Sequence, residues 1–191
     1  MGFLLLGGLL AGCDLVFRDQ LLYVRDAVDS GQWYRLFTCH FTHFTPYHLI
    51  MNLAGAAMAY AILFPRRIGR FITVMLMLGV LLGVGLHLWA IGLMVYGGFS
   101  GVLHGLVVFG IVQQLGLDRR DPFWWLALVC VAGKLIYEQS AAFDPGAMTA
   151  WLTVPVATVA HWQGSLAGLA LGLVFFAWDH QRGLEQRQPS R

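Results

Sequence analysis

A serine in a glycine-flanked segment and a distant histidine are the residues of this sequence best suited to chemistry. Ser100 lies in the segment Gly98-Phe99-Ser100-Gly101 at the start of one apolar stretch, and His161 lies in another. Polar side chains at membrane depth usually have a functional reason, because bulk water is absent there. A serine and a histidine at the same depth could act as nucleophile and general base. Taken singly, each residue is also explained by helix packing.

The composition predicts an integral membrane protein. Of 191 residues, 58% are hydrophobic and 12% are charged, whereas soluble domains are about half apolar and about a quarter charged. The net charge of +2 is too small to indicate a nucleic-acid partner. The length predicts one membrane domain, residues 1–180, followed by a short basic cytoplasmic tail, residues 181–191.

Six apolar stretches predict an all-α polytopic membrane protein, a compact bundle of six transmembrane helices. Thr45 before Pro46 is a typical helix start, with threonine as the N-cap and proline at the first helical position. The predicted helices are Gly2–Phe17, Pro46–Phe64, Phe71–Val95, Ser100–Leu117, Phe123–Tyr137 and Val154–Trp178.

Arginine clusters predict the orientation of these helices. Clusters follow the second, fourth and sixth stretches, which places them on one side of a six-helix bundle, and the positive-inside rule makes that side cytoplasmic. Both termini are then cytoplasmic, and Ser100 lies near the outer boundary of the membrane. The clusters are Arg66, Arg67 and Arg70; Arg119 and Arg120; and Arg182, Arg187 and Arg191.

Glycines at four-residue spacing lie near both candidate catalytic residues. Small residues at this spacing let two helices approach closely in a membrane. Such packing would bring Ser100 and His161 together at one depth, although bundle packing alone would also explain the pattern. The two series are Gly97, Gly101 and Gly105, and Gly164, Gly168 and Gly172.

His48 and Asn52 lie on one face of a predicted helix because they are four residues apart. With the Ser100 backbone N–H, they could donate hydrogen bonds to the oxyanion of an acyl-transfer reaction; polar contact between helices is the alternative. His40, His43 and His48 also suggest a metal site, but no acidic or thiolate partner has supporting spacing. The sequence therefore predicts neither a metal nor a cofactor.

In order along the chain, these motifs resemble those of the rhomboid family of intramembrane serine proteases. The resemblance implies that Ser100 is the nucleophile, that His161 is the general base, and that His48 and Asn52 form the oxyanion site. It implies supporting roles for His43, Arg35, Gly98, Gly101, Gly164 and Gly168. The motifs are Tyr34-Arg35, His43 with His48-Leu49-Ile50-Met51-Asn52, Gly98-Phe99-Ser100-Gly101, and His161-Trp162-Gln163-Gly164 followed by Gly168.

Two positions depart from the family pattern. The family commonly has Trp-Arg in the first loop, where this chain has Tyr34-Arg35. Many rhomboids have a tyrosine stacked on the catalytic histidine, at the position that His104 occupies here. No aspartate is placed to complete a triad with His161, so we expect stacking of His104 to orient its ring.

Several features resemble the bacterial rhombosortase subfamily: His104, the compact length, and Lys134 with Glu138-Gln139. That resemblance implies protein substrates with a C-terminal transmembrane tail that starts at Gly-Gly, in the bacterial inner membrane, with the active site toward the periplasm. The bilayer is the other expected partner. Lys134 and Glu138 fit either an ion pair along one helix or a role in substrate recognition.

A rhomboid-like pseudoenzyme that binds or escorts membrane proteins is the main alternative to a protease. It would keep the bundle and lack the catalytic pair, whereas this chain has both Ser100 and His161. A transporter is disfavoured, because the sequence has no evident inverted repeat.

Overall fold

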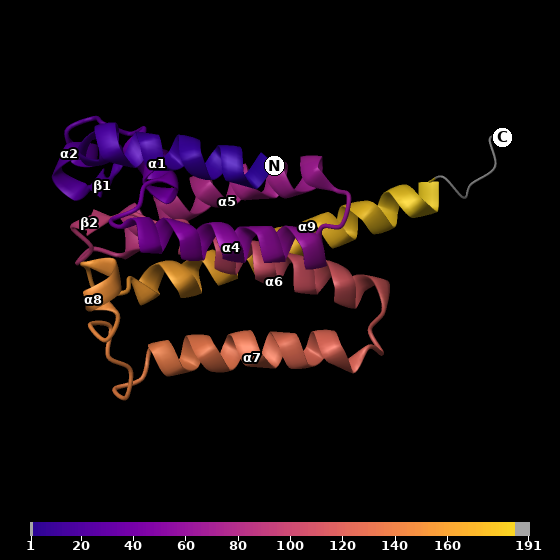
Figure 1. Ribbon diagram of the computed structural model, residues 1–191. Helices are drawn as coiled ribbons and strands as arrows, with labels where there is room; N and C mark the ends of the chain where they lie inside the picture. Colours follow the sequence, from indigo (N-terminus) through magenta and orange to yellow (C-terminus); the bar gives the residue numbers. More distant parts are fainter. Residues whose placement is uncertain (1, 186–191) are drawn as a thin grey trace.

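The computed structural model describes residues 2–185, with side chains for residues 11, 12 and 14–181. Long helices run side by side, and the short elements gather at one end of the bundle (Figure 1). Residues 186–191 of the predicted tail lie outside the described part. The elements are α1 (Gly2–Leu21), β1 (Tyr23–Val24), α2 (Arg25–Asp29), α3 (Arg35–Thr38), η1 (Cys39–Phe41), α4 (Pro46–Leu63), α5 (Ile68–Trp89), β2 (Val95–Tyr96), α6 (Ser100–Leu117), α7 (Pro122–Glu138), α8 (Thr149–Leu152) and α9 (Thr158–Glu185).

Four helices of the described chain, α4, α5, α6 and α9, are long and apolar enough to cross a membrane. The chain is therefore a multi-pass integral membrane protein. Two further long helices, α1 and α7, run beside them at the edges of the bundle (Figure 1). These six helices correspond to the six predicted stretches, but α1 and α7 are not among the four that meet the criteria for a span.

The predicted start of α4 is confirmed. The Thr45 hydroxyl accepts a hydrogen bond from the backbone N–H of His48 at 3.1 Å, and Pro46 occupies the first helical position. The threonine side chain accepts a hydrogen bond from a backbone N–H that has no partner within the helix. Proline has no backbone N–H and so leaves no unpaired donor at the first position. This local signal fixes where His48 and Asn52 lie along α4.

The predicted helix Phe71–Val95 is wrong at its C-terminal end, because α5 stops at Trp89. The Arg25 guanidinium donates to the carbonyls of Leu86 and His87 in the last turn of α5, and to those of Ala90 and Leu93 in the segment that follows. The chain then continues into β2, which pairs antiparallel with β1. The connection to α6 is consequently longer than the four residues predicted.

The predicted helix Val154–Trp178 also differs from the structure, where α9 begins at Thr158 and runs to Glu185. Pro155 explains why Val154 lies outside the helix, because proline disfavours helical geometry in the residue before it. His161 therefore lies in the first turn of α9, at the same end of the bundle as Ser100 at the start of α6.

Glycines allow α6 and α9 to pack backbone against backbone. A Cβ atom on Gly164 would lie 2.0 Å from the carbonyl oxygen of Gly101, and one on Gly168 would lie 2.1 Å from that of Gly105. These distances are far below van der Waals contact, so side chains would force the helices apart. The outer members of the two predicted series behave differently: Gly97 precedes α6 and faces Leu22, and Gly172 faces the Val112 side chain.

Candidate active site

Ser100 and His161 meet where α6 and α9 begin. The Ser100 Oγ lies 3.0 Å from the His161 Nε2, which is hydrogen-bond distance. Ser100 is half-buried and His161 is buried. The close contact of Gly101 with Gly164 lies one residue after Ser100 and three residues after His161, and it fixes the separation of the two helices at this depth. The pair has the geometry needed for proton transfer between a nucleophile and a base.

His104 packs flat against His161, as its position one turn after Ser100 led us to expect. The two ring centroids are 4.2 Å apart and the planes differ by 16°. The Nδ1 of His104 lies 2.7 Å from the Ser100 carbonyl oxygen, so Nδ1 must carry a proton to donate this bond. That hydrogen bond holds His104 against its own helix, where its ring limits tilting of the His161 ring.

A carboxylate also contacts His161, and the sequence analysis did not connect the two. The Glu138 Oε2 and Oε1 lie 2.9 and 3.1 Å from the His161 Nδ1, and Glu138 is buried at the end of α7. Lys134, one turn earlier on α7, contacts the Oε1 of Glu138. The ion pair considered from the sequence is therefore present, and its acidic member reaches the candidate base.

Chain topology is the signal that could have found Glu138. The next transmembrane segment begins on the side of the bundle where the preceding one ends. Glu138 ends α7 and His161 lies in the first turn of α9, so both belong to the same end of the bundle. A carboxylate near the membrane boundary, such as Glu138, was thus a candidate partner for His161. Its four-residue spacing from Lys134 indicated only an ion pair within the helix or a role in substrate recognition.

His48 lies beside the segment that leads to Ser100. A Cβ on Gly98 would come within 2.6 Å of the His48 ring, and the positive φ of Gly98 (+137°) also favours glycine at this position. Asn52, one turn further along α4, is buried. In the described part of the chain, its side-chain nitrogen has no hydrogen-bond partner.

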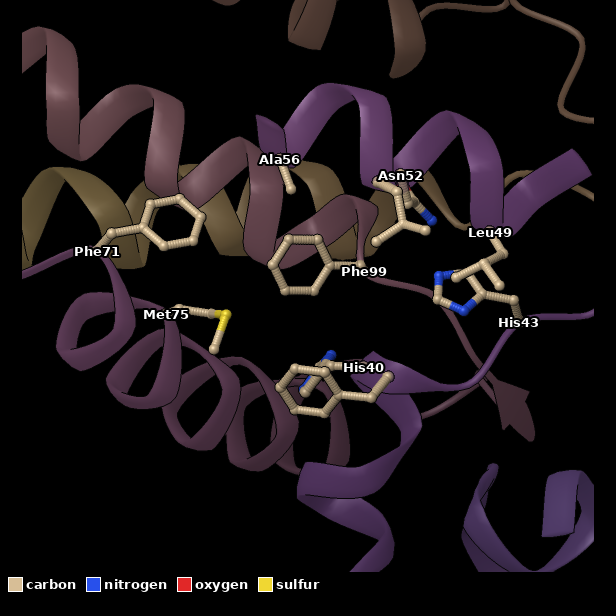
Figure 2. A pocket seen from close by; sticks show the side chains of 10 residues that line it. His40, His43, Leu49, Asn52, Ala56, Phe71, Met75 and Phe99 are labelled. Carbon is tan, nitrogen blue, oxygen red and sulfur yellow. The ribbon is translucent and has the colours of Figure 1, made fainter. Parts of the chain in front are cut away.

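A small apolar cavity adjoins these residues. Its volume is about 80 Å³. Figure 2 shows that Asn52, His43 and Phe99 border it from different parts of the chain. The other lining residues are His40, Phe41, Leu49, Leu53, Ala56, Phe71 and Met75.

His43 supports His48 from the first loop. Their rings meet edge to face, with centroids 5.1 Å apart. Asp14 of α1 holds His43 in place: it accepts the His43 backbone N–H at 2.9 Å, and its other oxygen lies 3.4 Å from Nδ1. The sequence analysis did not identify Asp14, because its partner is in a different element.

Arg35 ties the first loop to the end of α1. Its guanidinium donates to the carbonyls of Asp19 and Leu22 at 2.8 and 2.7 Å, and to the Gln32 side chain at 2.7 Å. Arg35 is buried, so these bonds satisfy a charge that would otherwise be costly. Its position is that of a structural support, away from the reacting side chains.

The histidines considered as metal ligands do not form a common site: within the described residues, His40, His43 and His48 do not converge. His40 is fully buried, and burial lowers the pKa of its imidazole to about 4, so the ring is neutral and packs against Tyr96. A different trio, His104, Glu138 and His161, has ligand atoms within 4.8 Å. Two nearly parallel stacked imidazoles, however, cannot direct their nitrogen lone pairs at one ion, because those lone pairs lie in the ring planes.

An apolar groove reaches the site from the side, between α7 and the pair α4 and α6. Its volume is about 380 Å³. His104 and Lys134 line it, so the groove extends to the end of the bundle where Ser100 and His161 lie. The remaining lining residues are Gly55, Met58, Ala59, Ile62, Leu63, Leu103, Val107, Ile111, Phe123, Trp124, Ala127 and Val131.

The comparison with protein families agrees with this architecture. The family model described as "Rhomboid domain" matches residues 30–178, which is more than half of the chain. The matched region includes Ser100, Glu138 and His161. No individual protein with a curated description matches the chain significantly. The chain therefore belongs to the rhomboid family, whose members are generally intramembrane serine proteases that act on membrane proteins.

Proposed function

We propose that the protein is an intramembrane serine endopeptidase in which Ser100 attacks the peptide carbonyl and His161 is the general base. The observation that carries the proposal is the 3.0 Å distance between the Ser100 Oγ and the His161 Nε2. As the Oγ–carbon bond forms, His161 takes the hydroxyl proton; it then gives that proton to the leaving amine. Water subsequently attacks the acyl-serine, assisted by the same histidine.

His48, Asn52 and the Ser100 backbone N–H form the proposed oxyanion site. Ser100 is the first residue of α6, where backbone N–H groups have no partner within the helix. The positive end of the helix dipole also favours a developing negative charge there. The buried nitrogen of Asn52, which has no hydrogen-bond partner among the described residues, supports a role as an additional donor.

Replacing Asn52 or His48 with alanine is expected to lower kcat by about 10²-fold or more, because a donor to the oxyanion is lost. The measurement is turnover of a transmembrane substrate by the purified protein. Met51→Ala is the matched control, since Met51 is exposed on the same helix. Wild-type turnover by a folded Asn52→Ala variant would remove Asn52 from the oxyanion site.

The proposed location is the bacterial inner membrane, with six spans, cytoplasmic termini and the active site toward the periplasm. The arginine distribution supports this orientation. In it, the short elements around Ser100 cover the periplasmic end of the bundle, and the chain leaves α9 on the cytoplasmic side.

The proposed substrates are secreted or surface proteins with a C-terminal transmembrane anchor that begins at Gly-Gly. The groove between α7 and the pair α4 and α6 is apolar and lateral, which suits a segment arriving from the bilayer. A transmembrane helix must unwind before its carbonyl can be attacked, because its backbone groups are already paired. Glycine assists unwinding, since it lowers helix stability by about 1 kcal/mol relative to alanine.

A reporter with Gly-Gly directly before its C-terminal anchor is expected to be released by the purified protein in vesicles. Changing both glycines to leucine should slow release sharply, because the segment then stays helical. Ser100→Ala protein is the control for contaminating proteases. Equal release of the two reporters would contradict the Gly-Gly preference while leaving the protease assignment intact.

A further inference from the structure

Both ring nitrogens of His161 have partners, and this determines how the ring must be protonated. To accept the Ser100 proton, the neutral imidazole must have a free lone pair at Nε2, which lies 3.0 Å from Oγ. Its own proton is then at Nδ1, where the Glu138 carboxylate lies at 2.9 Å. A carboxylate accepts that proton's hydrogen bond and cannot donate one in its place, so Glu138 selects the productive tautomer.

We infer that Glu138 is a positioning residue, which makes the catalytic unit Ser100–His161–Glu138, and that Lys134 positions Glu138 in turn. The inference rests on the proposed function. Glu138 holds the Nδ1–H of His161, and it stabilises the imidazolium that forms when Nε2 takes the serine proton. The proton stays on His161 throughout, as in other carboxylate-assisted histidine bases.

Burial distinguishes this role from simple helix stabilisation. Glu138 is the one buried side chain among the described residues of α7. A buried carboxylate costs free energy unless it is paired. Its placement is also unfavourable for the helix, because a negative charge at the C-terminus opposes the helix dipole, and Lys before Glu is the weaker order for an i, i+4 pair. Helix stability therefore does not explain why α7 has a glutamate here.

Lys134 and His104 constrain the unit in different ways. Lys134 contacts the Oε1 of Glu138, while the Oε2 makes the shorter contact with His161, so the carboxylate is held from both sides. The flat contact of His104 limits tilting of the His161 ring. Glu138 limits rotation of that ring within its own plane, which stacking cannot do.

The test replaces Glu138 with glutamine, which keeps the shape and removes the charge. We expect kcat for a transmembrane substrate to fall by about 10²- to 10⁴-fold, as when a carboxylate behind a catalytic histidine becomes an amide, with KM and melting temperature unchanged. Reaction of Ser100 with a fluorophosphonate should slow in parallel, because that reaction needs the base but no substrate binding. Glu138→Asp should retain part of the rate that Glu138→Gln loses. Lys134→Met should lower kcat by less than Glu138→Gln does.

Asp144→Asn is the matched control, since it makes the same carboxylate-to-amide change at an exposed position in the loop after α7. Unchanged kcat and fluorophosphonate reactivity in a folded Glu138→Gln variant would overturn the inference. A lower melting temperature or a higher KM with unchanged kcat would also overturn it, because either result would indicate a purely structural role. A wild-type protein that neither cleaves nor reacts with the probe at Ser100 would instead refute the proposed function.

Discussion

Ser100→Ala and His161→Ala are each expected to lower cleavage at least about 10³-fold, to or below detection. The first change removes the nucleophile, and the second leaves the hydroxyl without a base at 3.0 Å. The double variant should be little worse than either single variant, because the two side chains act in one step. Residual activity would reflect binding and the oxyanion donors alone.

These variants are best measured with a transmembrane substrate in vesicles, with melting curves to show that each protein is folded. Ser140→Ala and His180→Ala are suitable controls, because both positions are exposed and lie outside the site. Cleavage by folded Ser100→Ala protein at the wild-type rate would refute covalent catalysis by this serine. A double variant far slower than either single one would show that the two residues act independently.

A large effect on stability is expected from Gly164→Ala. The added Cβ would lie 2.0 Å from the Gly101 carbonyl oxygen, and neither backbone can yield as a flexible side chain would. Separating α6 from α9 should cost about 3 kcal/mol or more, which lowers the melting temperature by about 10 °C. Activity should fall as well, because the same contact sets the distance between Ser100 and His161.

Gly133→Ala is the control for this change, because a Cβ at Gly133 on α7 meets nothing within 4 Å. Its effect should have the opposite sign, a gain of up to about 1 kcal/mol from the higher helix propensity of alanine. The measurement is the melting temperature of the Gly164→Ala and Gly133→Ala variants, determined in the same detergent. Similar melting temperatures would show that the backbone contact between α6 and α9 does not determine stability.

Local signals in the sequence were sufficient for much of the bundle. The start of α4 follows from a threonine and a proline next to each other, and the bounds of α6 agree with the apolar stretch Ser100–Leu117. Such features depend on neighbours within one helical turn. The place of His104 beside His161 was expected for a different reason, the resemblance to rhomboids, many of which have a tyrosine stacked on the histidine at this position.

Features that depend on distant residues could not be read in this way. The end of α5 is contacted by Arg25, more than sixty residues earlier in the chain. Asp14 becomes relevant only because α1 packs beside the first loop, where it meets His43. The spacing of Glu138 from Lys134 indicated their ion pair. Its contact with His161 depends on α9, which places the His161 ring within hydrogen-bond distance.

The length of α7 links catalysis to the physical state of the membrane. This helix has 17 residues, a length of about 26 Å, whereas the hydrocarbon core of a typical bilayer is about 30 Å thick. In the proposed six-span topology, a short helix at the edge of the bundle meets this hydrophobic mismatch by thinning the bilayer around it or by shifting along its axis. In the proposed mechanism its last residue holds the ring of His161, so turnover is expected to depend on the acyl-chain length of the surrounding lipids, with thicker bilayers drawing Glu138 away from His161.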